Sequence, residues 1–183
     1  MLFFIDDFNR VKLTSLSPGV SDYINASYVN GCFGKVAYIA TQGPLECTAE
    51  DFWRMVIQCD VITVVMLCEL LEDSKPKCFK YWPNMKEKKN FGGIRVSNVL
   101  LLVLYATVTH CFEVEEVNVK EHITTRQLVV RHDCGKREVH HFQYHGWPDH
   151  GSPEEIEPLL EFLEHVRVFQ KEDDCRPIVV HCR

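Results

Sequence analysis

The far end of the sequence places a cysteine directly after an apolar run. Pro177-Ile178-Val179-Val180 is followed by His181 and Cys182. The run predicts a buried strand, and ligands of open α/β sheets bind beyond the carboxyl ends of their strands. A cysteine there can act as a nucleophile if backbone N–H groups lower its pKa from about 8.5 and bind a phosphate. Local sequence alone fits a terminal cysteine without a chemical role equally well.

A single carboxylate stands in a segment that predicts a loop, Trp147-Pro148-Asp149-His150-Gly151. Proline and glycine break regular structure, and the tryptophan can anchor a hinge. An aspartate on a mobile loop can approach a leaving group and donate a proton as a general acid. Aspartate and glycine are also common in ordinary turns, and the segment taken alone favours that alternative.

The elements that must position these residues are a mixture of strands and helices. Apolar, β-branched or aromatic runs predict strands, and apolar residues at helical spacing predict one helix from about residue 48 and another over 157–170. The strands are expected at 38–40, 61–67, 78–82, 94–96, 126–131, 138–144 and 177–180. The fold class is therefore α/β (α+β), with a mixed, mostly buried, twisted sheet flanked by helices.

Composition limits the classes of function. The 183 residues are 46% hydrophobic and 25% charged, as in one soluble domain, and the net charge of −6 argues against nucleic-acid binding. The nine cysteines are scattered without a CxxC pair, which favours a reducing, cytoplasmic location. The most apolar stretch, 99–108, is about half as long as the roughly 20 residues of a membrane-spanning helix. The first residues also lack the pattern of a signal peptide.

Six sequence blocks occur in the order found in protein-tyrosine phosphatases, and the chain resembles that family over about 20–182. The blocks are Asp22-Tyr23-Ile24-Asn25-Ala26-Ser27, Tyr38-Ile39-Ala40-Thr41-Gln42-Gly43-Pro44-Leu45, Asp51-Phe52-Trp53-Arg54-Met55-Val56, Lys77-Cys78 with Tyr81-Trp82-Pro83, Trp147-Pro148-Asp149-His150-Gly151, and Val179-Val180-His181-Cys182.

The resemblance implies a hydrolase that removes phosphate from phosphotyrosine in proteins, as in signalling by dephosphorylation. Cys182 is implied to be the nucleophile that forms a phosphocysteine intermediate, and His181 to help hold its thiolate. Asp149 is implied to be the general acid for the tyrosine leaving group, and then the base for the water that cleaves the intermediate.

Supporting roles follow from the same resemblance. Trp147 and Pro148 belong to the acid-bearing loop, called the WPD loop in this family. Glu72 and Lys77 fall where the family has a loop that supports substrate binding and the closed acid loop. The resemblance implies no cofactor and no metal ion. The expected partner is a tyrosine-phosphorylated protein, with no nucleic acid and no membrane segment in this chain.

The sequence departs from the family pattern at both ends, so we expect residues 1–183 to be a single partial domain, incomplete at the C-terminus. The family continues after the cysteine with a phosphate-binding Ser-Ala-Gly-x-Gly-Arg stretch, whereas here Cys182 is followed by Arg183. The family's phosphotyrosine-recognition loop would precede residue 7. Because losing one oxyanion donor costs about 100–1000-fold in rate, we expect these 183 residues alone to be inactive.

A third departure is an expected non-family insertion at 97–112. Removing it would join Val96 to Glu113 and restore the family spacing to Arg126. Val-Ser-Asn can be encoded by a stretch that resembles a splice donor, so retained intron sequence is one hypothesis for the insertion. A transcript that joins Val96 to Glu113 would support this hypothesis.

Several alternatives accompany the phosphatase interpretation. The chain could be a catalytically silent pseudophosphatase or interaction module, which capture of phosphopeptides without turnover would reveal. If the full-length gene is longer, it could be the cytoplasmic domain of a membrane receptor. A metal site is disfavoured, because adjacent His140 and His141 point to opposite faces of a strand. The residues considered for it are His140, His141, His145, His150, His181 and Cys182.

Overall fold

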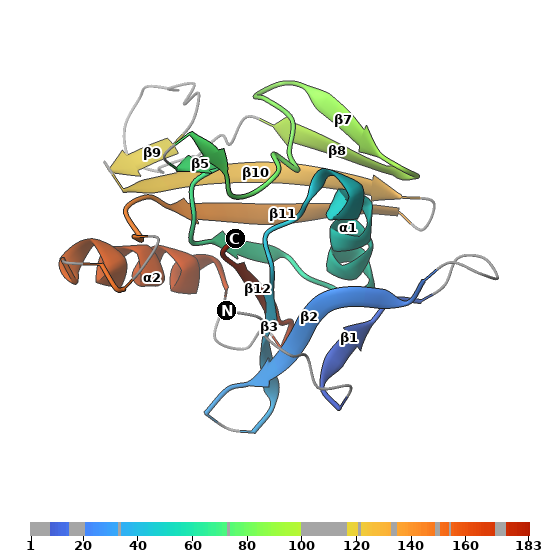
Figure 1. The fold of residues 1–183 in the computed structure, drawn as a ribbon, viewed down its shortest axis with the longest axis horizontal. Helices are drawn as coiled ribbons and strands as arrows, with labels where there is room; N and C mark the ends of the chain where they lie inside the picture. Colours follow the sequence, from blue (N-terminus) through green and yellow to red (C-terminus); the bar gives the residue numbers. More distant parts are fainter. Residues whose placement is uncertain are drawn as a thin grey trace, which may run out of the picture.

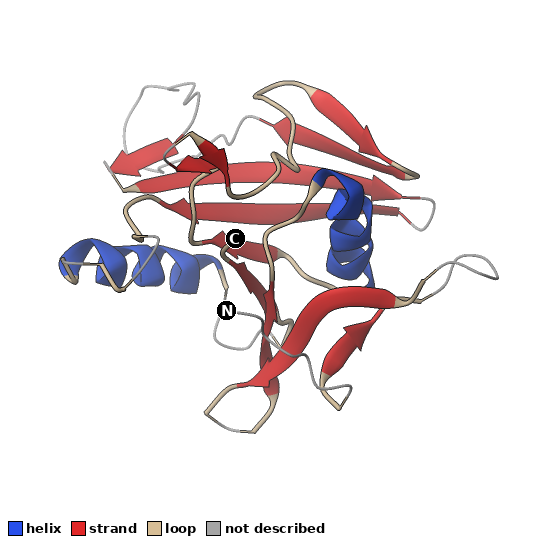
Figure 2. Ribbon diagram, viewed as in Figure 1, coloured by secondary structure: helices blue, strands red, loops and turns tan. Residues whose placement is uncertain are grey.

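One large mixed sheet organises the molecule (Figures 1 and 2). The computed structural model describes residues 8–14, 21–32, 34–72, 74–99, 117–120, 122–132, 135–148, 151–153, 155–170 and 175–183. The sheet order is β1-β2-β3-β12-β4-β11-β10-β8-β7, with β9 also paired to β10, and β5-β6 form a separate hairpin. The central strands β3, β12, β4 and β11 run parallel to one another, and the other neighbours are antiparallel.

The bounds of the elements are as follows. The strands are β1 Arg10–Lys12, β2 Tyr23–Asn30, β3 Val36–Thr41, β4 Thr63–Met66, β5 Leu71–Glu72, β6 Lys75–Pro76, β7 Lys88–Phe91, β8 Ile94–Val99, β9 Val117–Lys120, β10 Ile123–His132, β11 Gly135–Tyr144 and β12 Ile178–His181. The helices are the 3₁₀ turn η1 Glu46–Thr48, α1 Ala49–Gln58 and α2 Glu157–Phe169.

Strand β4 separates two apolar clusters on opposite faces of the sheet. Val64 and Met66 belong to the larger cluster, which includes the buried residues of α1. Val65 belongs to the second cluster, together with Phe162 of α2. Successive side chains of a strand point to opposite faces, so a continuous apolar run is what a strand covered on both sides requires. The central buried strand predicted at 61–67 is confirmed.

The predicted hairpin at 126–131 and 138–144 is confirmed, and it is longer than expected. Strands β10 and β11 pair over ten residues, from Ile123 opposite Tyr144 to His132 opposite Gly135. The two adjacent histidines of β11 do face opposite ways. The His141 ring lies 4.7 Å from that of Trp82, whereas the His140 ring lies 4.8 Å from that of Phe169.

The strand predicted at 78–82 is wrong, because this segment is a loop that crosses the larger cluster. The Phe79 N–H donates to the Pro44 carbonyl at 2.8 Å, and Tyr81 and Trp82 are 0% and 3% exposed. The Trp53 indole N–H donates to the Tyr81 carbonyl at 2.9 Å. The aromatic residues that suggested a strand therefore serve core packing and hydrogen bonding.

Helix α2 is confirmed, and only some of its apolar residues face the sheet. Phe162 and Val166 are buried, while Leu160 and Leu163 are 58% and 53% exposed. Apolar side chains lie around more than one side of this helix, so spacing alone did not decide which side contacts the sheet.

The expected insertion at 97–112 is described only at its beginning. Ser97 and Val99 lie in β8, where they pair with Val129 and Gln127 of β10. The remainder, from residue 100, lies outside the described residues, and the insertion stays a prediction. Within the described part of the chain, no helix is both long and apolar enough to cross a membrane.

We expect Phe142→Ala to lower the free energy of unfolding by about 3–5 kcal/mol, because a large aromatic side chain leaves a cavity in the core. Phe142 is fully buried in the second cluster, 5.3 Å from the ring of Phe169. Val168→Ala is the matched control, since Val168 is 68% exposed and its loss should change stability by less than about 0.5 kcal/mol. Urea unfolding measures both, and equal losses would contradict this account of the core.

Candidate active site

The carboxyl ends of the four parallel strands meet at one edge of the sheet, and Cys182 lies there. Strand β12 ends at His181. The His181 carbonyl accepts a hydrogen bond from the Leu67 N–H at 2.9 Å. The Cys182 side chain is exposed, with Sγ 3.9 Å from the Leu67 carbonyl oxygen. The segment that leads to Trp147 leaves β11 at the same edge. The predicted placement of the cysteine beyond a strand tip is confirmed by this geometry.

A buried chain of hydrogen bonds runs beneath Cys182. The Tyr81 hydroxyl lies 2.6 Å from His181 Nε2 and 2.7 Å from His141 Nε2. His181 Nδ1 lies 2.9 Å from the Cys182 carbonyl oxygen. A carbonyl can only accept, so Nδ1 carries the proton, and Nε2 of this neutral ring accepts from the tyrosine hydroxyl. The ring of His181 is thus fixed in one tautomer.

The other end of this series of hydrogen bonds is the guanidinium of Arg126. Arg126 lies over the Trp82 ring, 4.7 Å from its centroid, and its NH1 lies 3.3 Å from His141 Nδ1. Because the guanidinium can only donate, His141 accepts at Nδ1 and donates from Nε2 to Tyr81. The bonds therefore run in one direction, from Arg126 to the carbonyl of Cys182.

Burial keeps both imidazoles neutral. Desolvation lowers the pKa of His181 to about 4, against a smaller opposing effect of its hydrogen bond to Cys182. The pKa of His141 is also held well below its usual value, first by burial and then by electrostatic interactions with Arg126 and His181. His181 therefore acts as a neutral hydrogen-bond donor to the backbone of Cys182, and its implied part in holding the thiolate remains a prediction.

The surroundings of the Cys182 thiol favour its protonated form. Its pKa is raised, chiefly by a hydrogen bond with the Cys68 thiol, then by burial and by the charges of Cys68 and Glu72. A hydrogen bond from the backbone of Arg183 acts in the opposite direction. A backbone N–H donor of this kind lowers the pKa of a cysteine and so activates it. Here its effect is smaller than the combined effects that raise the pKa.

The acid-bearing loop is described in part. Trp147 is half-buried against the second cluster and Pro148 is exposed, whereas Asp149 and His150 lie outside the described residues. The implied role of Asp149 as general acid therefore stays a prediction.

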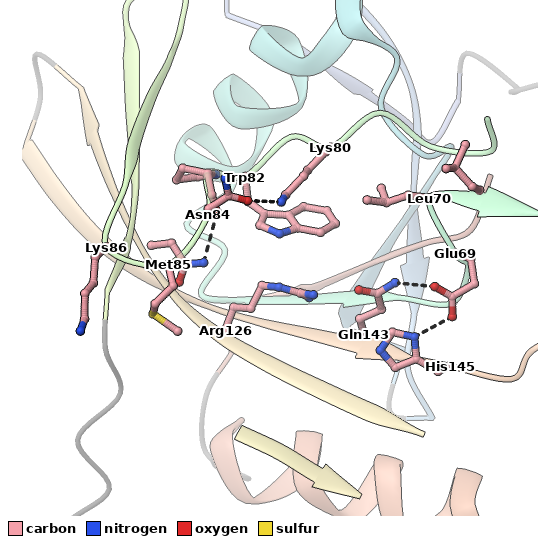
Figure 3. A pocket seen from close by; sticks show the side chains of 13 residues that line it. Glu69, Leu70, Lys80, Trp82, Asn84, Met85, Lys86, Arg126, Gln143 and His145 are labelled. Carbon is pink, nitrogen blue, oxygen red and sulfur yellow. Dashed lines mark hydrogen bonds and ion pairs between the residues drawn. The ribbon is translucent and has the colours of Figure 1, made fainter. Parts of the chain in front are cut away.

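The strand end that leads into this loop is fixed by hydrogen bonds of His145 to two residues that sequence reasoning missed, Glu69 and Thr124. His145 Nδ1 lies 2.6 Å from Glu69 Oε1, and its Nε2 lies 2.7 Å from the Thr124 hydroxyl. These three residues meet because β10 pairs with β11 and because the loop after β4 lies beside them. No local sequence pattern reveals such a long-range contact. Glu69 and His145 also line an open cleft of about 930 Å³, in which Arg126 and Gln143 are visible (Figure 3).

Glu72 and Lys77 come together as the implied supporting pair. Glu72 ends β5 and Lys77 directly follows β6, with Lys77 Nζ 3.5 Å from Glu72 Oε2. The Lys77 N–H donates to the Leu70 carbonyl at 2.9 Å. The charge of Glu72 contributes to the raised pKa of Cys182, which places the hairpin within electrostatic reach of the thiol. Their role toward substrate stays a prediction.

We expect the free energy of unfolding to fall as the pH decreases from 6.5 toward 5. The pKa of His181 is about 4 in the folded protein and near 6.5 when unfolded, so only the unfolded chain gains a proton in this range. Each such histidine contributes a slope of up to about 1.4 kcal/mol per pH unit. Urea unfolding at several pH values measures the slope. It should decrease in His141→Gln and persist in His165→Gln, and a flat profile of the unsubstituted chain would contradict the neutral, buried histidines.

Comparison with known proteins agrees with this geometry. The chain matches the protein-tyrosine phosphatase family over residues 2–183. It is 42% identical over 178 residues to receptor-type tyrosine-protein phosphatase F of Rattus norvegicus, and 35% identical over 178 residues to human tyrosine-protein phosphatase non-receptor type 12. Each match covers 96% of this chain, but only 8% and 21% of the respective relative.

A solved structure shows the same fold. The catalytic domain of human protein tyrosine phosphatase non-receptor type 18 is 34% identical, with a TM-score of 0.82. The match covers 96% of this chain and 58% of that one, so the chain spans little more than half of the solved domain. Sequence, fold and the strand-tip cysteine agree, and the chain belongs to the protein-tyrosine phosphatase family, a family of hydrolases.

Proposed function

We propose that this chain carries the nucleophile and the general acid of a phosphotyrosine hydrolase. The observation that carries the proposal is the position of Cys182 at the tip of β12. Its carbonyl oxygen accepts a hydrogen bond from the buried, neutral His181. This arrangement fixes the cysteine at the exposed edge of the sheet, where a phosphate can approach.

The proposed reaction has two steps. The thiolate of Cys182 attacks phosphorus, and an S–P bond forms as the P–O bond to the tyrosine breaks. Asp149 donates a proton to the leaving phenolate oxygen. Asp149 then takes a proton from water that attacks phosphorus, the S–P bond breaks, and inorganic phosphate leaves with the thiolate restored.

Formation of the thiolate needs donors beyond those described. The raised pKa of Cys182 shows that the contacts of Cys68, Glu72 and Arg183 together favour the thiol. The Ser-Ala-Gly-x-Gly-Arg stretch of the family would supply backbone N–H groups and an arginine on the open side of the thiol. We therefore propose that catalytic competence requires residues that follow Cys182 in the longer relatives.

The proposed substrate is phosphotyrosine in a protein, and the proposed location is the cytoplasm or the cytoplasmic domain of a receptor. The solved structures of non-receptor type 18 include complexes with HER2 phosphopeptides, which supports this substrate class for the family fold. The relatives include receptor and non-receptor proteins.

We expect no hydrolysis of a small aryl phosphate above background by the 183-residue chain. The same chain extended through the corresponding segment of receptor-type phosphatase F should turn the substrate over, because the added donors stabilise the thiolate and the phosphate. Cys182→Ser should abolish this turnover, and Cys175→Ser, at an exposed cysteine away from the site, should leave it unchanged. Turnover by the 183-residue chain that disappears in Cys182→Ser would overturn the need for the extension.

We expect Asp149→Asn in the extended chain to reduce kcat on phosphotyrosine by about 100–10,000-fold, the usual contribution of a general acid. The reduction should be smaller for an aryl phosphate whose phenol is more acidic, because that leaving group needs less protonation. Asp22→Asn is the control, since Asp22 precedes β2 and forms an ion pair with Arg10 of β1, the border strand of the sheet. Equal losses on both substrates would exclude Asp149 as the acid.

A further inference from the structure

Three metal-binding side chains gather in the core just beneath Cys182. Cys68 follows β4, Cys78 lies in the loop after β6, and His181 ends β12. Their donor atoms all lie within 4.8 Å of one another. The three residues are 3%, 6% and 1% exposed, so the cluster is enclosed.

The cluster is arranged around one backbone oxygen. The Cys68 thiol donates to the Cys182 carbonyl at 2.9 Å, and His181 Nδ1 donates to the same oxygen at 2.9 Å. Gly43 closes the third side, since a Cβ placed there would lie 2.6 Å from this oxygen and 3.2 Å from Cys78 Sγ. Two of the three donors therefore converge on this oxygen, and the backbone at Gly43 lies close both to the oxygen and to the third donor, Cys78 Sγ.

Two thiolates and an imidazole form the donor set that Zn²⁺ prefers. Bonds of about 2.3 Å to sulfur and 2.0–2.1 Å to nitrogen place tetrahedral ligands roughly 3.5–3.8 Å apart. A spread of at most 4.8 Å requires a contraction of about 1 Å, within the reach of side-chain rotation. The two thiols would release their protons to solvent, so the ion and its two thiolates would bury no net charge.

We propose that Cys68, Cys78 and His181 form a Zn²⁺ site, with His181 binding through Nδ1 and the Cys182 thiol beside the fourth position. Cys182 directly follows His181, and its carbonyl oxygen accepts hydrogen bonds from both Cys68 and His181, which brings residue 182 next to the ion. Zinc bound at Nδ1 removes the donor that holds the carbonyl of Cys182. Metal binding and the proposed nucleophile are thus coupled, but the site itself does not depend on phosphatase activity.

The surroundings of His181 suit a metal ligand. A ligating imidazole normally bonds through its other nitrogen to a partner that fixes the ring. Here Nε2 contacts the Tyr81 hydroxyl at 2.6 Å, and a hydroxyl can accept from Nε2–H as readily as it donates to Nε2. Tyr81 is itself held by the hydrogen bond from Trp53 to its carbonyl. In the metal-free chain the ring is held in one tautomer, and binding of zinc at Nδ1 would replace it by the other without turning the ring.

Metal titration of the reduced, metal-free chain tests the proposal. We expect one equivalent of Co²⁺ to produce a thiolate-to-cobalt charge-transfer band in the near ultraviolet and tetrahedral d–d bands in the visible. One equivalent of Zn²⁺ should abolish them. In competition with a chromophoric chelator, Cys68→Ser and Cys78→Ser should each weaken Zn²⁺ binding by about 100-fold or more, because each removes a direct ligand. Cys47→Ser and Cys175→Ser, at exposed cysteines, should not.

A second measurement needs no variant and covers the case in which a substituted chain fails to fold. X-ray absorption of the zinc-loaded, unsubstituted chain should show at least two sulfur ligands at about 2.3 Å and a histidine nitrogen at about 2.0 Å. A shell of nitrogen and oxygen ligands alone would overturn the site. Zinc affinity that is unchanged in folded Cys68→Ser, or reduced equally in Cys47→Ser, would overturn it as well.

Discussion

The insertion of β12 between β3 and β4 is the constraint on which the rest of the site depends. Val179 pairs with Ile39 on one side and with Val64 on the other, so the register of this short strand is fixed from both directions. A slip of one residue would turn every side chain of β12 to the opposite face. His181 would then leave Tyr81, and the backbone that presents Cys182 would lose its donor.

The polar chain from Arg126 to the Cys182 carbonyl explains how several polar groups are tolerated inside an apolar cluster. Every ring nitrogen along it has a partner, and the direction of the bonds follows from its two ends, a donor-only guanidinium and an acceptor-only carbonyl. Buried polar groups that are fully paired specify a unique arrangement, whereas an unpaired one is costly. This series of hydrogen bonds thereby defines one orientation for the rings of His141 and His181.

Sequence reasoning predicted the parts of the fold that have strong local signals. The β-branched run at 61–67 and the hairpin β10–β11 were predicted, as were both α-helices and the strand before Cys182. The strand expected at 78–82 failed because aromatic enrichment does not distinguish a strand from a loop that crosses the core. The sequence also did not show which apolar residues of α2 are buried, since Phe162 and Leu163 are adjacent and only the sheet decides between them.

The residues of the candidate site likewise differ in whether a local sequence signal could identify them. Cys182 and His181 could be identified because they follow one apolar strand, and their order matches a family pattern. The grouping of Cys68 and Cys78 with His181 could not, because three separate segments bring them together and their spacing matches no metal-ligand motif. Glu69 and Thr124 around His145 escaped prediction for the same reason.

The position of β12 also has a consequence for how the chain folds. Its partners β3 and β4 lie about 140 and 115 residues earlier in the sequence, so the centre of the sheet closes through contacts of very long range. Such contacts slow folding because the entropy of a long loop is lost before they form. Until β12 arrives, the facing edges of β3 and β4 stay unpaired and able to bind strands of other molecules. The segment that presents the cysteine is therefore also the one whose late arrival governs aggregation during folding.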